Sequence, residues 1–371
     1  MKKKTAGHII ILIAFVIIVC LSKGIWFFTE KYFDSANYEN RQMATRPRLT
    51  LDNYASFSTD YTSFFNDSLQ FRNNLISLDS EINYFCFGKS SNEHVIVGDN
   101  NWLFYSNEED GDPISCYQGT NLYTEEELVR IAQNCMDQRD YLASQGKEFV
   151  IYIAPNKERV YSEYMPERYG KPADNYGALQ IYNYLKKNTD IRVVYPYDAL
   201  MEAKSIIKTN IYYKTDTHWN YVGSYIGAAE LMAELGIEMP KVYSDSISIN
   251  TAGKTSGDLA GMLNLSKQLR FADYEYTVDG YDAHDSTCID ASDFYGLWSY
   301  RASNADPRII YVMRDSFSTH LAIYIGSQFK ESYLRHKKTY SYDDLIACNP
   351  DIVVYETVER LADELGSFSI H

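Results

Sequence analysis

The hydrophobic positions of this chain fall into short continuous runs that are separated by longer stretches of helical character. Residues 149–154 and 309–313 are continuous apolar runs, which predict strands buried on both faces of a sheet. Shorter strands are predicted at 192–195 and 351–355. Helices are predicted around them, at residues 124–146, 176–187, 220–235, from about 319, and up to about 365. This alternation indicates an α/β fold with a doubly wound, mostly parallel sheet and flanking helices.

Local signals support several of these elements. Thr124 and Glu127 form the Thr-x-x-Glu pattern of a capping box at a helix start. Asn220 is a good N-cap for the helix that follows it. Residues 95–105 alternate around a polar turn and predict a β-hairpin. Residues 237–300 show no clear periodicity, and we expect them to be rich in loops.

The N-terminus carries the pattern of a membrane anchor. Three lysines precede an apolar run, and residues 8–28 are about long enough to cross a bilayer. The positive charges predict a cytoplasmic tail at 1–7, a transmembrane anchor at 8–28, and a body outside the cytoplasm. A cleaved signal peptide is the alternative, but no small-x-small cleavage site follows the run.

After the anchor we expect a stalk and one catalytic domain. Residues 29–90 predict an N-terminal arm with amphipathic helical character at 61–83. Residues 91–371 are long enough to form one large α/β domain with its own core. The expected location is therefore the plasma membrane, as a single-pass protein whose catalytic domain is extracytoplasmic.

The composition narrows the classes of partner and cofactor. A net charge of −15 argues against nucleic acid, because no basic stripe is present to neutralise phosphates. The 34 tyrosines offer flat, amphipathic contacts for sugars, although a compositional habit is the simpler explanation of their number. The cysteines outside the anchor are scattered without a CxxC pair, which argues against structural zinc and predicts free thiols, with one disulfide as the alternative.

Ser316 is the first candidate for chemistry. It closely follows the strand at 309–313 and precedes a helix. A strand–turn–helix setting exposes a nucleophilic hydroxyl near the positive end of a helix, where backbone N–H groups can stabilise an oxyanion. The alternative is that Asp315 and Ser316 merely cap the helix.

His218 is the best candidate for the base that a nucleophilic serine needs. Asp216 lies two residues earlier in a polar loop, where its carboxylate can hold one imidazole nitrogen and stabilise the imidazolium. The alternative is that both side chains only bond the loop backbone. No third or fourth ligand stands at a recognisable metal spacing, so no metal is expected. The other histidines have weaker settings: His8, His94, His284, His320, His336 and His371.

Two segments carry a resemblance to a known family. Residues 215–220, Thr-Asp-Thr-His-Trp-Asn before a Gly/Ala-rich helix, and residues 315–318, Asp-Ser-Phe-Ser after a strand, resemble the alginate O-acetyltransferase family, AlgJ and AlgX, and the related DHHW proteins. Supporting segments stand in the same order along residues 35–365: Glu39-Asn40-Arg41 with Pro47, Phe71-Arg72, Val97-Gly98 with Trp102-Leu103-Phe104, Pro155-Asn156-Lys157 with Met165-Pro166, Gly257-Asp258-Leu259 with Met262, and Pro350-Asp351 through Glu356 to Arg360.

The resemblance implies an SGNH hydrolase-like fold in which the Asp-His pair precedes the nucleophile. It implies that Ser316 is the nucleophile, His218 the general base and acid, and Asp216 the residue that orients His218. Arg314 stands where many relatives have glycine, which bears on the tightness of the turn. The candidates for oxyanion or substrate contacts are Phe317, Asn156, Lys157, Arg314 and Trp219.

The implied function is an O-acetyltransferase that acts outside the cytoplasm on a cell-surface or exported polysaccharide, through an acyl-serine and without a cofactor. Acetyl-CoA is cytoplasmic, so the resemblance also implies a membrane-bound O-acyltransferase partner that supplies acetyl groups. One alternative is an acetyl esterase with the same three residues and water as the acceptor. Another is a non-catalytic polysaccharide-binding or scaffold protein, against which the intact Asp216, His218 and Ser316 argue.

Overall fold

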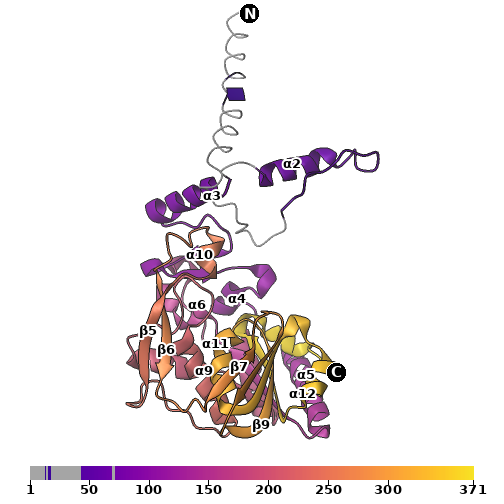
Figure 1. The fold of residues 1–371 in the computed structure, drawn as a ribbon, viewed down its shortest axis with the longest axis vertical. Helices are drawn as coiled ribbons and strands as arrows, with labels where there is room; N and C mark the ends of the chain where they lie inside the picture. Colours follow the sequence, from indigo (N-terminus) through magenta and orange to yellow (C-terminus); the bar gives the residue numbers. More distant parts are fainter. Residues whose placement is uncertain (1–12, 14–15, 18–42, 69–71) are drawn as a thin grey trace, which may run out of the picture. The chain divides into compact units, whose positions relative to one another are not determined.

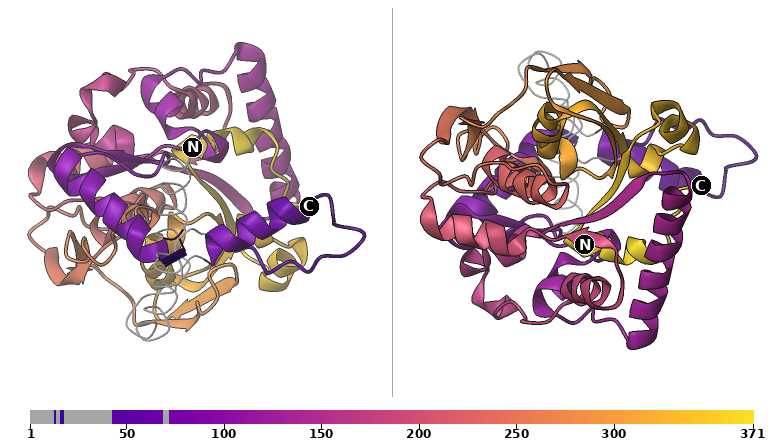
Figure 2. Two further views of the ribbon diagram at one scale, coloured as in Figure 1. Left: turned by 90° about the horizontal axis from the view of Figure 1, so that it is seen from above. Right: turned by 90° about the horizontal axis from the view of Figure 1, so that it is seen from below.

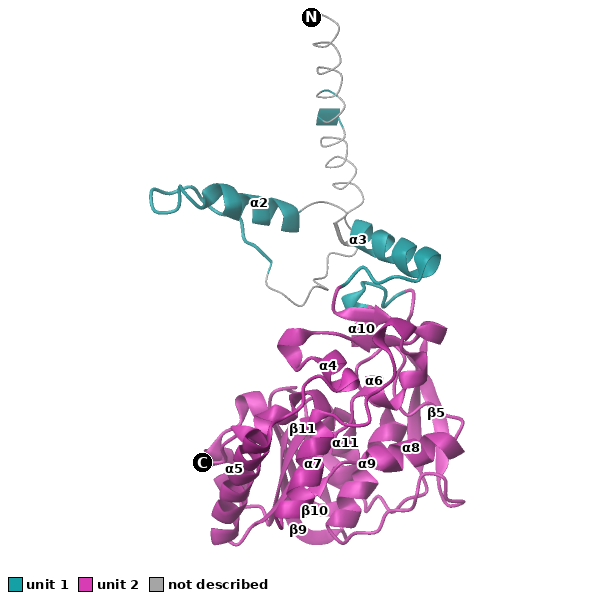
Figure 3. Ribbon diagram, turned by 180° about the vertical axis from the view of Figure 1, so that it is seen from behind, with its two compact units in different colours: residues 1–92, 261–267 teal, residues 93–260, 268–371 magenta. Residues whose placement is uncertain are grey.

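The computed structural model describes residues 13, 16–17, 43–68 and 72–371, which form two compact units (Figure 3). Unit 1 comprises residues 1–92 and 261–267, and unit 2 comprises residues 93–260 and 268–371. The predicted tail, nearly all of the predicted anchor at 8–28 and the first part of the predicted stalk lie outside the described residues. Among the residues that are described, no helix has both the length and the apolarity needed to cross a bilayer.

In unit 1, the amphipathic helical segment expected at residues 61–83 is split into separate helices. These are the α-helices α2 (Phe57–Asp67) and α3 (Arg72–Glu81), followed by the π-helical turn η2 (Ile82–Cys86). Helix α2 buries none of its side chains.

Unit 2 is built on a seven-stranded sheet with the order β4-β3-β11-β9-β10-β8-β7. Five neighbouring strands are parallel, namely β4, β3, β11, β9 and β10. Strands β8 and β7 add an antiparallel edge. The predicted α/β architecture with a mostly parallel sheet is therefore confirmed. The bounds are β3 (Glu148–Ala154), β4 (Arg192–Val194), β7 (Ser286–Asp290), β8 (Leu297–Ala302), β9 (Asp306–Arg314), β10 (Phe329–His336) and β11 (Ile352–Val358).

Helices cover both faces of this sheet (Figures 1 and 2). Alternate side chains of β3 enter two separate cores: Val150 and Tyr152 pack in one, and Phe149 and Ile151 in the other. Helices α8, α9 and α11 supply the first core, and α5, α7 and α12 supply the second. The helices are α4 (Pro113–Gln118), α5 (Glu125–Ser144), α6 (Lys157–Val160), α7 (Gly177–Asn188), α8 (Tyr197–Ile206), α9 (Tyr221–Glu234), α10 (Asp258–Met262), α11 (Ser318–Gln328), α12 (Tyr342–Cys348) and the 3₁₀ segment η8 (Glu359–Gly366).

The expected local signals are present. Thr124 and Glu127 form both bonds of the capping box, and the Asn220 side chain accepts from two N–H groups of α9. The predicted hairpin is the antiparallel pair β1 (Val95–Val97) and β2 (Leu103–Tyr105). All five cysteines of the described chain are free thiols. Cys116 and Cys135 are buried, as expected of apolar free thiols, whereas Cys348 is half-buried and Cys86 and Cys288 are exposed.

The loop-rich prediction for residues 237–300 was wrong, because four strands begin within this region. Strands β5 (Ser248–Thr255) and β6 (Asp273–Asp279) form an antiparallel pair, and β7 and β8 extend the main sheet. Every residue of β7 is exposed, and β5 buries none of its residues fully. Strands β5 and β7 lack a buried face and so show no hydrophobic alternation that the sequence pattern could reveal. Strand β8 does alternate, with Trp298, Tyr300 and Ala302 buried, and was missed.

Candidate active site

Ser316 lies in a tight turn at the carboxyl end of a central strand. Strand β9 ends at Arg314, and α11 begins at Ser318. We call residues 315–317 the Ser316 turn. The N-cap of α11 is Phe317 and has no side-chain cap bond, so Ser316 does not serve as a cap. Its hydroxyl instead lies 2.8 Å from Nε2 of His218.

Two buried carboxyl groups fasten the Ser316 turn to the neighbouring strand β11. The carboxylate of Asp315 accepts from the N–H groups of Phe317 and Val358, each at 2.8 Å. Glu356 accepts from the N–H of Asp315 at 2.7 Å. Burial and the nearby charge of Asp315 raise the pKa of Glu356 well above its usual range. Despite burial, Lys337 and the hydrogen bond from Glu356 lower the pKa of Asp315, so the pair holds one proton.

His218 is carried by a loop that turns back on itself. A bridge between Tyr212 and Trp219 closes the loop, and we call residues 214–218 the His218 loop. Oδ1 of Asp216 lies 2.6 Å from Nδ1 of His218 and accepts from the His218 backbone N–H at 2.9 Å. Asp216, His218 and Ser316 therefore form one continuous hydrogen-bonded chain of carboxylate, imidazole and hydroxyl.

The electrostatics of the pair suit a general base. Burial disfavours the charged form of His218, but the charge of Asp216 and the hydrogen bond to it raise the pKa of His218 overall. Burial likewise opposes ionisation of Asp216, yet the charge of His218 and hydrogen bonds from three N–H groups lower the pKa of Asp216. The carboxylate thus stays ionised and stabilises the imidazolium when it forms.

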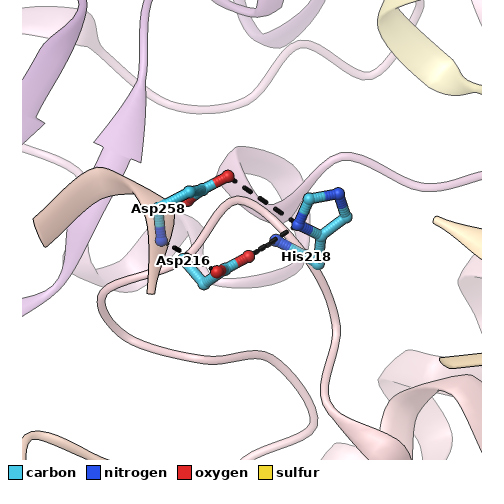
Figure 4. Close-up of side chains that lie close together, drawn as sticks. All are labelled: Asp216, His218 and Asp258. Atoms are coloured by element: carbon cyan, nitrogen blue, oxygen red, sulfur yellow. Dashed lines mark hydrogen bonds and ion pairs between the residues drawn. The ribbon is translucent and has the colours of Figure 1, made fainter. Parts of the chain in front are cut away.

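Asp258 is a second acidic residue beside His218, and the sequence analysis gave it no role. Its carboxylate accepts from the backbone N–H and the hydroxyl of Thr217, and one oxygen lies 3.8 Å from Nδ1 of His218. Its backbone N–H donates to Oδ2 of Asp216 at 2.9 Å. Figure 4 shows both carboxylates directed toward the imidazole. The sequence feature that could have indicated Asp258 is the Gly257-Asp258 pair. A glycine is needed at position 257 because a Cβ there would lie 2.1 Å from Cβ of Asp216.

Asp216, His218 and Asp258 are also the one group among the described residues that could hold a metal ion. Both oxygens of Asp216 already accept hydrogen bonds, as do both oxygens of Asp258. The imidazole is engaged at Nδ1 by Asp216 and at Nε2 by Ser316. A ligating imidazole must leave one nitrogen free for the metal, so this arrangement suits proton transfer better than metal binding.

Lys157 and Asn156, two of the predicted substrate contacts, lie after the carboxyl end of β3. The buried Lys157 ammonium donates to the carbonyls of Asp216 at 2.6 Å and Lys214 at 3.1 Å, so it holds the His218 loop. Burial lowers the pKa of Lys157 to about 8. The Asn156 N–H donates to Glu359, whereas its buried side-chain amide has no partner within the described chain.

The other three predicted contacts brace the Ser316 turn. The indole of Trp219 donates to the Phe317 carbonyl at 2.9 Å, and the Phe317 ring packs 4.9 Å from that of His218. The Arg314 guanidinium donates to the Asp315 carbonyl and stacks 3.8 Å from the Trp298 ring. The Phe317 N–H is already bonded to Asp315, whereas the Ser316 N–H has no acceptor in the described chain and is the better oxyanion candidate.

The other histidines of the described chain do not bond to Ser316. His320 packs 4.6 Å from the ring of Tyr221, and burial together with the charge of His218 lowers the pKa of His320 to about 4. His336 accepts from the N–H of Lys338, and burial and Arg314 lower its pKa to about 4. Both imidazoles are therefore neutral at neutral pH, and His218 alone is bonded to the serine.

Comparisons with known proteins identify the family to which the chain belongs. Residues 95–293, more than half of the chain, match the family described as SGNH hydrolase-like domain, acetyltransferase AlgX. A "Probable alginate O-acetylase AlgJ" of Pseudomonas putida is 30% identical over 178 residues, 46% of this chain and 42% of that protein. Its namesake in Pseudomonas syringae pv. tomato is 28% identical over 158 residues, 39% of each chain. The matches thus span about two fifths of these curated relatives.

Two solved structures share the fold at low sequence identity. Bacillus cereus PatB1 with a sulfonyl adduct has a TM-score of 0.51 and 16% identity, over 74% of this chain and 98% of that one. A DHHW family protein from Eubacterium siraeum has a TM-score of 0.50 and 16% identity, over 73% and 97%. The fold is thus the SGNH-like one expected from the resemblance, and the chain belongs to the AlgJ/AlgX-like family of SGNH hydrolase-like proteins.

Proposed function

We propose that this protein is an O-acetyltransferase that places acetyl groups on a polysaccharide through an acetyl ester of Ser316. The observation that carries the proposal is the unbroken chain from Asp216 to His218 at 2.6 Å and from His218 to Ser316 at 2.8 Å. The family match and the name of the curated AlgJ relatives support acetyl transfer to a polysaccharide.

In the first half-reaction, Ser316 Oγ attacks the acetyl carbonyl carbon of the donor while Nε2 of His218 takes the hydroxyl proton. The tetrahedral oxyanion is stabilised by backbone N–H groups, with that of Ser316 as one candidate. The intermediate collapses when His218 returns the proton to the leaving oxygen of the donor, which leaves acetyl on Ser316. Asp216 keeps the imidazole oriented throughout and stabilises its positive charge.

In the second half-reaction, a sugar hydroxyl gives its proton to His218 and attacks the acetyl carbonyl carbon. The Oγ–acyl bond breaks, and the proton passes from His218 to Ser316 Oγ. The product is an acetylated sugar and the free enzyme. Water in place of the sugar would yield acetate, and partial exposure of Ser316 and His218 favours this esterase reaction as the second candidate.

The site is proposed to lie outside the cytoplasm, held to the plasma membrane by residues 8–28. A membrane-bound O-acyltransferase is then the proposed source of acetyl groups, because acetyl-CoA does not reach that side. Protease added to intact cells tests the topology: it should remove the body after about residue 30. Protection of the whole body in intact cells, with cleavage after lysis, would contradict this location.

The serine itself is tested with the full-length chain and p-nitrophenyl acetate. Nitrophenol should be released, and intact-mass spectrometry should show one added acetyl group on Ser316. Ser316→Ala should abolish both, whereas Ser144→Ala, an exposed serine on α5, should change neither. An acetyl group that persists in Ser316→Ala would remove the proposed mechanism and favour the non-catalytic alternative.

A further inference from the structure

A cavity of about 570 Å³ opens between the antiparallel pair of strands β5 and β6 and the helices α9 and α11. These four elements lie together in Figure 1. The volume is sufficient for a small ligand such as one or two sugar residues. The lining residues are Tyr221, Ala252, Glu275, Tyr276, Thr277, Val278, Asp279, Tyr281, His320, Ile323 and Tyr324.

The cavity adjoins the elements that carry the three proposed catalytic residues, although none of the three is among its lining residues. Tyr221 follows His218 by three residues, and His320 follows Ser316 by four. Tyr213 connects the two places, because its N–H donates to the His218 carbonyl at 3.3 Å, and its hydroxyl donates to Glu275 at 2.6 Å and lies 3.5 Å from Nε2 of His320. A ligand in the cavity would therefore be separated from the His218 loop by the Tyr213 side chain.

The aromatic part of the lining suits a sugar ring. Four tyrosines contribute to the wall, and Tyr281 and Tyr324 pack edge to face with ring centroids 5.6 Å apart. Such mutual packing fixes the rings before a ligand arrives, and each ring offers a flat apolar face beside a polar hydroxyl.

The charged residues that line the cavity are all acidic. Glu275 and Asp279 line the cavity, and no lysine or arginine does. One oxygen of Glu275 accepts from Tyr213, and one oxygen of Asp279 accepts from Asn250 and Thr277. In the described chain no donor reaches their other oxygens, which can accept from sugar hydroxyls. A ligand carboxylate would meet two like charges here with no cation to offset them.

We propose that this cavity is the acceptor subsite and that it takes a sugar residue without a carboxylate, a neutral hexose or N-acetylhexosamine, rather than a uronate. The inference rests on the proposed function and deepens it. The inference follows from the two carboxylates and from the absence of basic residues in the lining of the cavity.

The test measures acetyl transfer by the full-length chain from p-nitrophenyl acetate to two acceptors, an N-acetylglucosamine tetramer and a mannuronate tetramer. The neutral tetramer should speed nitrophenol release and become acetylated, with a KM at least tenfold below that of mannuronate. Charges roughly 6 Å apart at intermediate dielectric account for about tenfold per carboxylate. Glu275→Gln with Asp279→Asn should narrow the preference, whereas Glu126→Gln, an exposed glutamate on α5, should leave it unchanged.

A second variant tests the cavity itself. Ala252 is exposed on β5, so Ala252→Trp should fill the cavity without disturbing the core. It should raise the KM for the neutral tetramer at least tenfold, whereas Ser144→Ala, an exposed serine on α5, should leave that KM unchanged. Preference for mannuronate, or an unchanged KM in Ala252→Trp, would overturn the subsite. Binding of neither tetramer to Ser316→Ala by calorimetry would also overturn it, whereas a wild type that is never acetylated would overturn the proposed function instead.

Discussion

The Ser316 turn and the His218 loop bring their side chains to one point, but they are held there by different means. The Ser316 turn is bonded to β11 through Asp315 and Glu356, within the central sheet. The His218 loop depends on groups from separate segments: Lys157 after β3, Asp273 at the start of β6, and Asp258 at the start of α10. We therefore expect changes around the turn to lower stability, and changes around the loop to lower activity in a folded protein.

The largest effect should come from the base itself. His218→Ala should lower kcat for nitrophenol release by about 10⁵- to 10⁶-fold, because no other group can accept the Ser316 proton. Asp216→Ala should lower it by about 10⁴-fold, since water can partly replace an orienting carboxylate. Thermal denaturation should show that both variants fold. Wild-type activity in His218→Ala would mean that another base acts, and His320 and His336 would be the next to replace.

The next effect concerns the close approach of two loops. A methyl group on Gly257 would overlap Asp216, so Gly257→Ala should displace the His218 loop and lower kcat about 100-fold. Gly253→Ala is the matched control, because a Cβ at that position meets no atom within 4 Å. If both variants keep full activity, the packing of Gly257 against Asp216 does not position the imidazole.

Loss of the hydrogen bonds that hold the Ser316 turn should lower the stability of the protein. Glu356→Ala leaves the N–H of Asp315 and the hydroxyl of Ser318 without their acceptor in a buried site. The free energy of unfolding should fall by about 1–3 kcal/mol, measured by urea denaturation. Glu356→Gln should be close to wild type, because the pKa of Glu356 is raised and a neutral amide replaces a neutral acid. A large loss in the glutamine variant would show that Glu356 is charged.

The smallest effect is a shift in pH dependence. His218 must be neutral to accept a proton, and its pKa is raised above the ordinary 6.5, so kcat/KM should fall with decreasing pH through a midpoint above 6.5. Asp216→Asn removes the charge that raises the pKa of His218. The midpoint at which the residual kcat/KM falls with decreasing pH should therefore move to lower pH. A pH profile with the same midpoint in both proteins would contradict this assignment.

The same contrast explains what could be predicted from the sequence. Strands β3, β9 and β11 are buried apolar runs, so the local pattern was sufficient to predict them. For Ser316 the local pattern left open a helix cap or a nucleophile, and the resemblance to a family favoured the nucleophile. Asp216 lies two residues from His218, so their contact was also local. Asp258 is 42 residues from Asp216, and its approach depends on a glycine whose importance is steric. Glu356 lies in an apolar strand, and its protonated state depends on burial that only the fold creates.

The position of β11 has a consequence for the order of synthesis. This strand is the last to be made, yet it lies between β3 and β9 and pairs with both. Until residues 352–358 are available, the earlier strands face a gap at the centre of the sheet, and Asp315 lacks two of its bonds. Long-range pairing of this kind is formed late and slowly. The Ser316 turn should therefore reach its hydrogen-bonded geometry only after residues 352–358 have been made and have paired with β3 and β9.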